Sequence, residues 1–234
     1  MKIGILQCDD VRPELLPAYG NYPVMFETLF SKVDADFEYQ TWRVLDGKLP
    51  ESTELCDGWL ITGSRHAAYE SHDWMLPLFD FIRTLHQQDK KLIGICFGHQ
   101  AVAEALGGTV VNSDKGWGLG VAENQVVQKK SWMQPGTETF ALLVSHQDQV
   151  VEPGNGGVTL IESDFCPHFM VQYNENMLTI QGHPEFSCSL ARDLMELRRE
   201  SVEKDVVDEA IASLLQPVDD IICARWMVHF FKGL

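Results

Sequence analysis

Basic side chains are scarce in this sequence. Its 18 lysine and arginine residues are outnumbered by 34 aspartate and glutamate residues, and the formal net charge is −16. A surface with this excess of negative charge repels the phosphate backbone of nucleic acids and anionic membrane surfaces. We therefore expect neither nucleic acid nor a membrane among the partners of this chain.

Long apolar runs and closely spaced cysteines are also missing. No stretch approaches the roughly 20 apolar residues of a membrane-spanning helix, and the apolar run at residues 3–6 is too short for a signal peptide. The six cysteines have neither C-x-x-C spacing nor the density of a disulfide-rich secreted domain. These absences favour a reducing, cytoplasmic location.

Short apolar runs alternate with helical patterns in the first half of the chain. Runs at residues 3–6, 37–44, 58–62 and 92–95 have the length and β-rich composition of strands that are covered on both faces. Apolar residues recur at helical spacing over residues 24–30 and 74–85, and a further helix is expected over 99–106. Alternation of this kind predicts an α/β fold with a parallel sheet and right-handed crossovers.

The pattern changes after residue 109, where strand-like runs with turns between them predict a small antiparallel extension. Residues 186–234 return to helical spacing, and the aromatic tail at 226–231 is either core or a dimer contact. We expect a single α/β domain with a central, mostly parallel sheet flanked by helices. Residues 1–190 would form its main part, and residues 191–234 a helical extension packed on it. Homo-oligomer formation is left open.

The strongest chemical signal lies directly after the apolar run at 92–95. Cys96 stands between Gly94 and Gly98. A nucleophile elbow needs small residues two positions before and after the nucleophile, because a strand turns sharply into a helix there. Backbone N–H groups at the start of that helix favour the thiolate form of the cysteine. A buried core cysteine is the alternative interpretation, since free cysteine is often buried.

A second motif, His183-Pro184-Glu185, follows a late strand expected over residues 177–180. A cysteine nucleophile needs a histidine to take and return its proton, and that histidine needs a third group to hold its ring. Glu185 has the chemistry of that third group. An isolated tripeptide of this kind is weak evidence, but together with the elbow it indicates a cysteine hydrolase.

With both motifs in place, the chain resembles the class I glutamine amidotransferases over about residues 1–190. In that family a G-x-C-x-G-x-Q elbow precedes an H-P-E tripeptide by a similar distance. The resemblance implies that Cys96, His183 and Glu185 form the catalytic triad and that Gln100 contacts the substrate. No metal or organic cofactor is implied.

Two further segments extend the resemblance. Residues 61–64 match the loop whose glycine amide, here that of Gly63, joins the amide of Phe97 in the oxyanion hole. Residues 144–148 match a segment near the substrate, which implies a binding role for Ser145 and His146.

The departures from the family pattern concern the shape of the pocket. Many members carry Gly-Gly-Pro where this chain has residues 62–64, Thr-Gly-Ser. Large members place a Gly-Tyr-Gly-like segment against the substrate, whereas this chain has Trp117 between two glycines. Trp117 is therefore expected to line the pocket and to reshape its end. The nearest resemblance is to small standalone members similar to plant γ-glutamyl peptidases.

The resemblance implies hydrolysis of the γ-glutamyl amide of glutamine, or of a related small molecule, through a cysteine thioester, with release of ammonia or an amine. The chain is then either a glutaminase subunit that serves a separate synthase or a free-standing γ-glutamyl peptidase. A non-enzymatic binding module on the same fold is the third hypothesis, and the intact triad motif counts against it.

Overall fold

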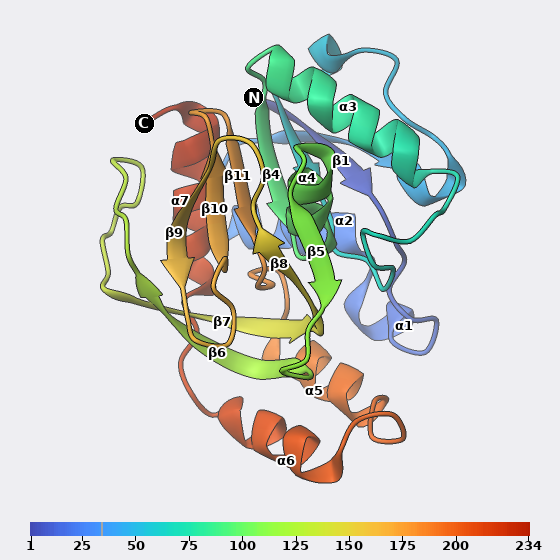
Figure 1. Ribbon diagram of the computed structural model, residues 1–234, viewed down its shortest axis with the longest axis vertical. Coiled ribbons are helices and arrows are strands. Elements are labelled where there is room, and N and C mark those ends of the chain that lie inside the picture. The colour runs from blue at the N-terminus through green and yellow to red at the C-terminus, as the bar shows by residue number, and fades with distance from the viewer. Residues whose placement is uncertain (34) are drawn as a thin grey trace.

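A sheet of nine strands runs through the computed structural model, which describes residues 1–33 and 35–234 (Figure 1). In spatial order the strands are β2 (Glu38–Arg43), β1 (Lys2–Gln7), β3 (Gly58–Ile61), β4 (Lys91–Ile95), β11 (Met177–Ile180), β10 (Met170–Tyr173), β9 (Gly157–Glu162), β6 (Gly118–Val126) and β7 (Thr139–His146). Strands β5 (Thr109–Asn112) and β8 (Asp148–Glu152) form a separate antiparallel pair.

The first five strands in this order, from β2 to β11, are parallel. We call them the parallel half of the sheet. Neighbouring residues of β3 face opposite sides: Leu60 packs with α2 (Tyr22–Ser31) and α7 (Asp220–Lys232), and Ile61 packs with α3 (Met75–Gln87) and α4 (Phe97–Ala105). Both side chains are fully buried, as expected for strands covered by helices on both faces. The predicted α/β fold with its parallel sheet is confirmed.

The remaining strands pair antiparallel from β11 through β10, β9 and β6 to β7. We call β10, β9, β6 and β7 the antiparallel half. The predicted antiparallel extension is therefore part of the central sheet, which it joins where β10 pairs with β11. Helices α5 (Cys188–Glu196) and α6 (Lys204–Ser213) lie against β6 and β7 (Figure 1).

Short helical segments complete the chain: α1 (Leu16–Tyr19) and the 3₁₀ turns Val44–Asp46 and Thr53–Leu55. The aromatic tail belongs to α7, where Trp226 and Phe230 are each 1% exposed and pack in the core. It is core and not a dimer contact. Within the described residues, no helix combines the length and the apolar character that crossing a membrane requires. The division at residue 190 stays a prediction, and that residue lies inside α5.

Candidate active site

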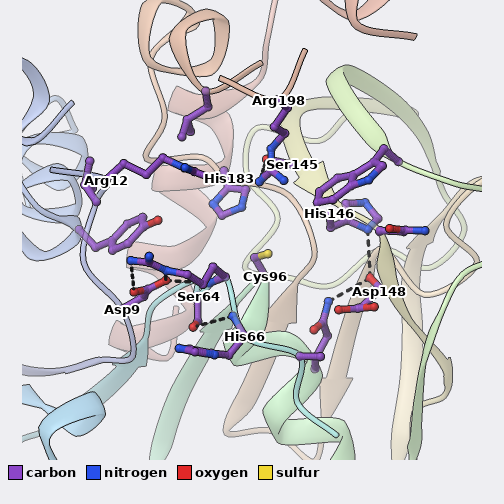
Figure 2. A pocket seen from close by; sticks show the side chains of 18 of the residues that line it. Asp9, Arg12, Ser64, His66, Cys96, Ser145, His146, Asp148, His183 and Arg198 are labelled. Atoms are coloured by element: carbon purple, nitrogen blue, oxygen red, sulfur yellow. Dashed lines mark hydrogen bonds and ion pairs between the residues drawn. The ribbon is translucent and has the colours of Figure 1, made fainter. Parts of the chain in front are cut away.

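The carboxyl ends of three neighbouring parallel strands meet at one edge of the sheet. Gly63 lies two residues after β3, Cys96 follows β4 directly, and His183 lies three residues after β11. These residues, which are far apart in sequence, thus surround the same place. Cys96 and His183 line a cavity of about 480 Å³, and Figure 2 shows the Cys96 sulfur beneath the imidazole of His183.

The backbone at Cys96 adopts a conformation that residues other than glycine rarely take. Its φ is 52° and its ψ is −99°, so the strand turns into α4 within one residue. The flanking glycines permit this turn. A Cβ on Gly94 would lie 2.5 Å from the carbonyl oxygen of Gly98, and a Cβ on Gly98 would lie 2.6 Å from that of Ile61. The backbone therefore has the features expected of a nucleophile elbow.

His183 is held from two sides. Its Nδ1 donates a hydrogen bond of 2.8 Å to Oε1 of Glu185, and Phe186 stacks on the ring with centroids 4.0 Å apart. Burial lowers the pKa of His183, but the Glu185 carboxylate and Cys96 outweigh burial and raise it to about 10. Because Nδ1 is committed to Glu185, Nε2 is the ring nitrogen left to exchange a proton with a reacting group.

Two backbone segments, at Gly63 and at Phe97, lie beside Cys96. A Cβ on Gly63 would lie 3.0 Å from Cε1 of His183 and 3.7 Å from Cβ of Cys96, so the Gly63 backbone is packed against both. The loop is fixed by Thr62, whose Oγ1 accepts from the Cys8 amide and donates to the Gly63 carbonyl. The Phe97 amide is the first of α4, where helical N–H groups have no intrahelical acceptor. The Gly63 loop and the start of α4 thus flank Cys96.

The side chains expected on the substrate side all line the same cavity: Gln100, Trp117, Ser145 and His146. Gln100 donates from Nε2 to the Asp148 carbonyl and to Oε1 of Gln181. His146 donates from Nδ1 to the same carbonyl of Asp148, and burial lowers the pKa of His146 to about 4. Burial therefore favours the neutral form of His146, whereas the Glu185 carboxylate favours the charged form of His183.

Comparison with known proteins decides the family. The family model of class-I glutamine amidotransferases matches residues 37–198. The chain belongs to this family. It is similar to γ-glutamyl peptidase 4 of Arabidopsis thaliana, with 32% identity over 76% of this chain and 73% of that protein. It is also similar to γ-glutamyl peptidase 5 of the same plant, with 30% identity over 92% of this chain and 89% of that protein.

A solved structure of a glutamine amidotransferase from Thermotoga maritima has the same fold. It superposes with a TM-score of 0.78 over 99% of both chains at 16% sequence identity. The class-I glutamine amidotransferases are enzymes, so this chain belongs to an enzyme family. The family match ends at residue 198, which also lines the cavity.

That last residue, Arg198, is a member of the pocket that sequence reasoning missed. Its guanidinium lies 4.1 Å from the centroid of the Trp117 ring and donates to Oγ of Ser145. Burial lowers its pKa, and nearby Arg12 lowers it further. Among the described residues no carboxylate forms an ion pair with Arg198 or Arg12, and both line the cavity (Figure 2). No local motif marks either arginine, so only the fold reveals them.

A second missed group orders the loop after β3. The side chain of Arg65 donates from Nε and Nη2 to the two carboxylate oxygens of Asp9, each at 2.8 Å, and the Arg65 amide donates to the same carboxylate. Asp9 is 4% exposed. This bidentate pair ties the loop that carries Gly63 to the end of β1.

Proposed function

We propose that this protein hydrolyses γ-glutamyl amides with Cys96, His183 and Glu185 as its triad. The Cys96 thiolate attacks the δ-carbonyl carbon, and the amides of Gly63 and Phe97 stabilise the resulting oxyanion. The imidazolium of His183 gives its Nε2 proton to the departing nitrogen as the C–N bond breaks. A γ-glutamyl thioester on Cys96 remains.

Water completes the cycle. His183, now neutral, accepts a proton from a water molecule that attacks the thioester carbonyl, and the C–S bond breaks to release glutamate and the Cys96 thiolate. Glu185 holds the imidazole in one orientation and stabilises its cationic form. No step needs a metal or an organic cofactor. The observation that carries this proposal is that Cys96 and His183 line one cavity, while Glu185 is hydrogen-bonded to His183 and the Gly63 backbone packs against both Cys96 and His183.

The pocket favours a γ-glutamyl peptide over glutamine as the substrate. Its volume of about 480 Å³ is within the range of about 300–1,000 Å³ found for pockets that bind drug-sized ligands. Arg198 offers a guanidinium without a carboxylate partner among the described residues, and such a group binds carboxylates well. A peptide leaving group carries a carboxylate, whereas ammonia does not. The relatives named γ-glutamyl peptidases support this choice.

The test is a panel of glutamine and γ-glutamyl peptides assayed with the purified protein alone. We expect wild type to hydrolyse at least one γ-glutamyl peptide and Cys96→Ser to lose at least about 10³-fold in kcat, because serine is far less ionised than cysteine. Cys188→Ser is the matched control, since Cys188 is the cysteine outside the catalytic site that is not fully buried. It should retain activity.

Two results would overturn this assignment. Equal activity in Cys96→Ser and wild type would exclude Cys96 as the nucleophile. A pure, folded protein that ignores the whole panel, yet hydrolyses glutamine when a synthase is added, would identify it as a glutaminase subunit. A cytoplasmic location is part of the proposal, and the six unpaired cysteines suit a reducing compartment.

A further inference from the structure

Three side chains with metal-binding atoms meet on the loop between β3 and α3. Nδ1 of His66 lies 3.2 Å from Oε2 of Glu70, and Nε2 of His72 lies 2.7 Å from the same oxygen. All three atoms lie within 4.8 Å of one another. The side chains are 32%, 43% and 39% exposed, respectively. Solvent therefore reaches the cluster.

The cluster rests on a fixed base. Trp74 is 9% exposed and stacks on His72 with an interplanar angle of 13°, and its ring also contacts Phe97 of α4. At the other end of the loop, the His66 amide donates to Oγ of Ser64. The two imidazoles are thus held in place by packing and by the backbone, which lowers the entropy cost of gathering ligands around an ion.

We propose that His66, Glu70 and His72 bind one Zn²⁺ ion at the rim of the active-site cavity. Two imidazole nitrogens and one carboxylate oxygen form a ligand set that catalytic zinc sites use, with a fourth position left for water. Zinc–ligand bonds of about 2.0–2.2 Å separate tetrahedral ligand atoms by about 3.4 Å. The two separations from Oε2 of Glu70, 3.2 Å to His66 and 2.7 Å to His72, are already close to that value.

Charge and position both fit this assignment. Two neutral imidazoles and one carboxylate leave a single positive charge on the bound ion, within a chain whose formal net charge is −16. His66 and Glu70 line the cavity, whereas His72 does not. The ion would therefore lie against the cavity that Cys96 also lines. The inference does not depend on the proposed hydrolysis.

The competing interpretation is that Glu70 only accepts two hydrogen bonds and thereby orders the loop. Cys96 and His183 also offer zinc ligands, so the test uses the Cys96→Ala protein. We expect a chromophoric chelator competition to give one Zn²⁺ per chain. His72→Ala in the same background should bind at least about tenfold more weakly, because one of three ligands is lost. His86→Ala removes a half-buried histidine outside the cluster and should leave the affinity unchanged.

X-ray absorption on the Zn²⁺-loaded Cys96→Ala protein supplies a second measurement. It should show two imidazoles with light-atom ligands and no sulfur. Circular dichroism must show that His72→Ala is folded, and if it is not, Glu70→Gln replaces it. An unchanged affinity in a folded cluster variant, sulfur ligation, or the absence of stoichiometric binding would each refute the zinc site.

Discussion

The two halves of the sheet contribute different things to one cavity. In the parallel half, backbone geometry places the groups that we propose to react: Cys96 follows β4 at a positive φ, and the Gly63 amide follows β3. In the antiparallel half, side chains give the opposite wall its character, through Trp117 before β6 and Ser145 at the end of β7. Short sequence motifs are enough to predict atoms that the backbone places. Side chains that gather from several elements can be predicted only when the fold is known.

This contrast predicts that changes in the parallel half act on kcat. His183→Ala should lose at least about 10³-fold in kcat, because no base remains to move the proton, while Glu185→Gln should lose roughly 10–100-fold because it only orients that base. Steady-state kinetics with one γ-glutamyl peptide measures both. Full activity in both variants would move the base elsewhere, with His146 as the next candidate.

Changes in the wall that the antiparallel half forms together with the segment after α5 should act on substrate choice. Arg198→Met is expected to raise KM for a γ-glutamyl peptide by about 10–100-fold, since a charged hydrogen-bonded pair contributes about 1.5–3 kcal/mol, with little change for glutamine. Trp117→Tyr should shift the ratio of the two kcat/KM values. Arg192→Met, on the exposed face of α5, is the matched control. An equal rise in KM for both substrates would indicate that Arg198 binds the glutamyl group and not the leaving group.

The His183–Glu185 pair predicts a pH dependence of stability. The pKa of His183 is raised to about 10, above its ordinary value near 6.5, so its contribution is full below about pH 6.5 and is lost as pH rises through about 10. The free energy of unfolding should fall by on the order of 1–3 kcal/mol across this window. Urea unfolding at several pH values measures the slope, and Glu185→Gln should flatten it. Parallel slopes in both proteins would contradict the assignment.

The smallest expected effect tests the strain at the elbow. Cys96→Gly should be more stable than Cys96→Ala by about 1 kcal/mol, because glycine adopts a φ of 52° freely whereas a side chain is strained there. Both variants lack the thiol, so the difference reports the backbone alone. Ala101→Gly inside α4 should show the opposite sign. Thermal unfolding compares the variants, and equal stability of the first two would exclude strain at this turn.

The parallel half was predictable because each of its features is local. The strand expected at 92–95 is β4, and the helices expected at 24–30 and 74–85 are α2 and α3. Apolar runs and helical periodicity mark such buried elements directly. The elbow needed only its two glycines, whose close contacts with Gly98 and Ile61 leave no room for a side chain.

Part of the opposite wall could not be predicted from local patterns, although the antiparallel strands and the pocket positions of Trp117, Ser145 and His146 were. β5 and β8 are short and half exposed, and Val110 and Val150 are buried in them. Buried and exposed residues do not alternate regularly along these two strands, so the sequence lacks the two-residue repeat that marks a strand. Arg198 lies just beyond α5 in a stretch that looks like an ordinary charged helix end. Its approach to Trp117 depends on how α5 packs against β6 and β7, which is a long-range property of the fold.

The position of β11 has a consequence for the order in which the molecule is made. β4 pairs with β3 on one side and with β11 on the other. Because β6, β7, β9 and β10 all precede β11 in the chain, β11 leaves the ribosome only after the whole antiparallel half has been synthesised. Until then β4 has an open edge, which invites pairing with other chains, and Cys96 has no histidine beside it. The nascent chain therefore acquires the proposed catalytic base, His183, in the same step that covers the open edge of β4.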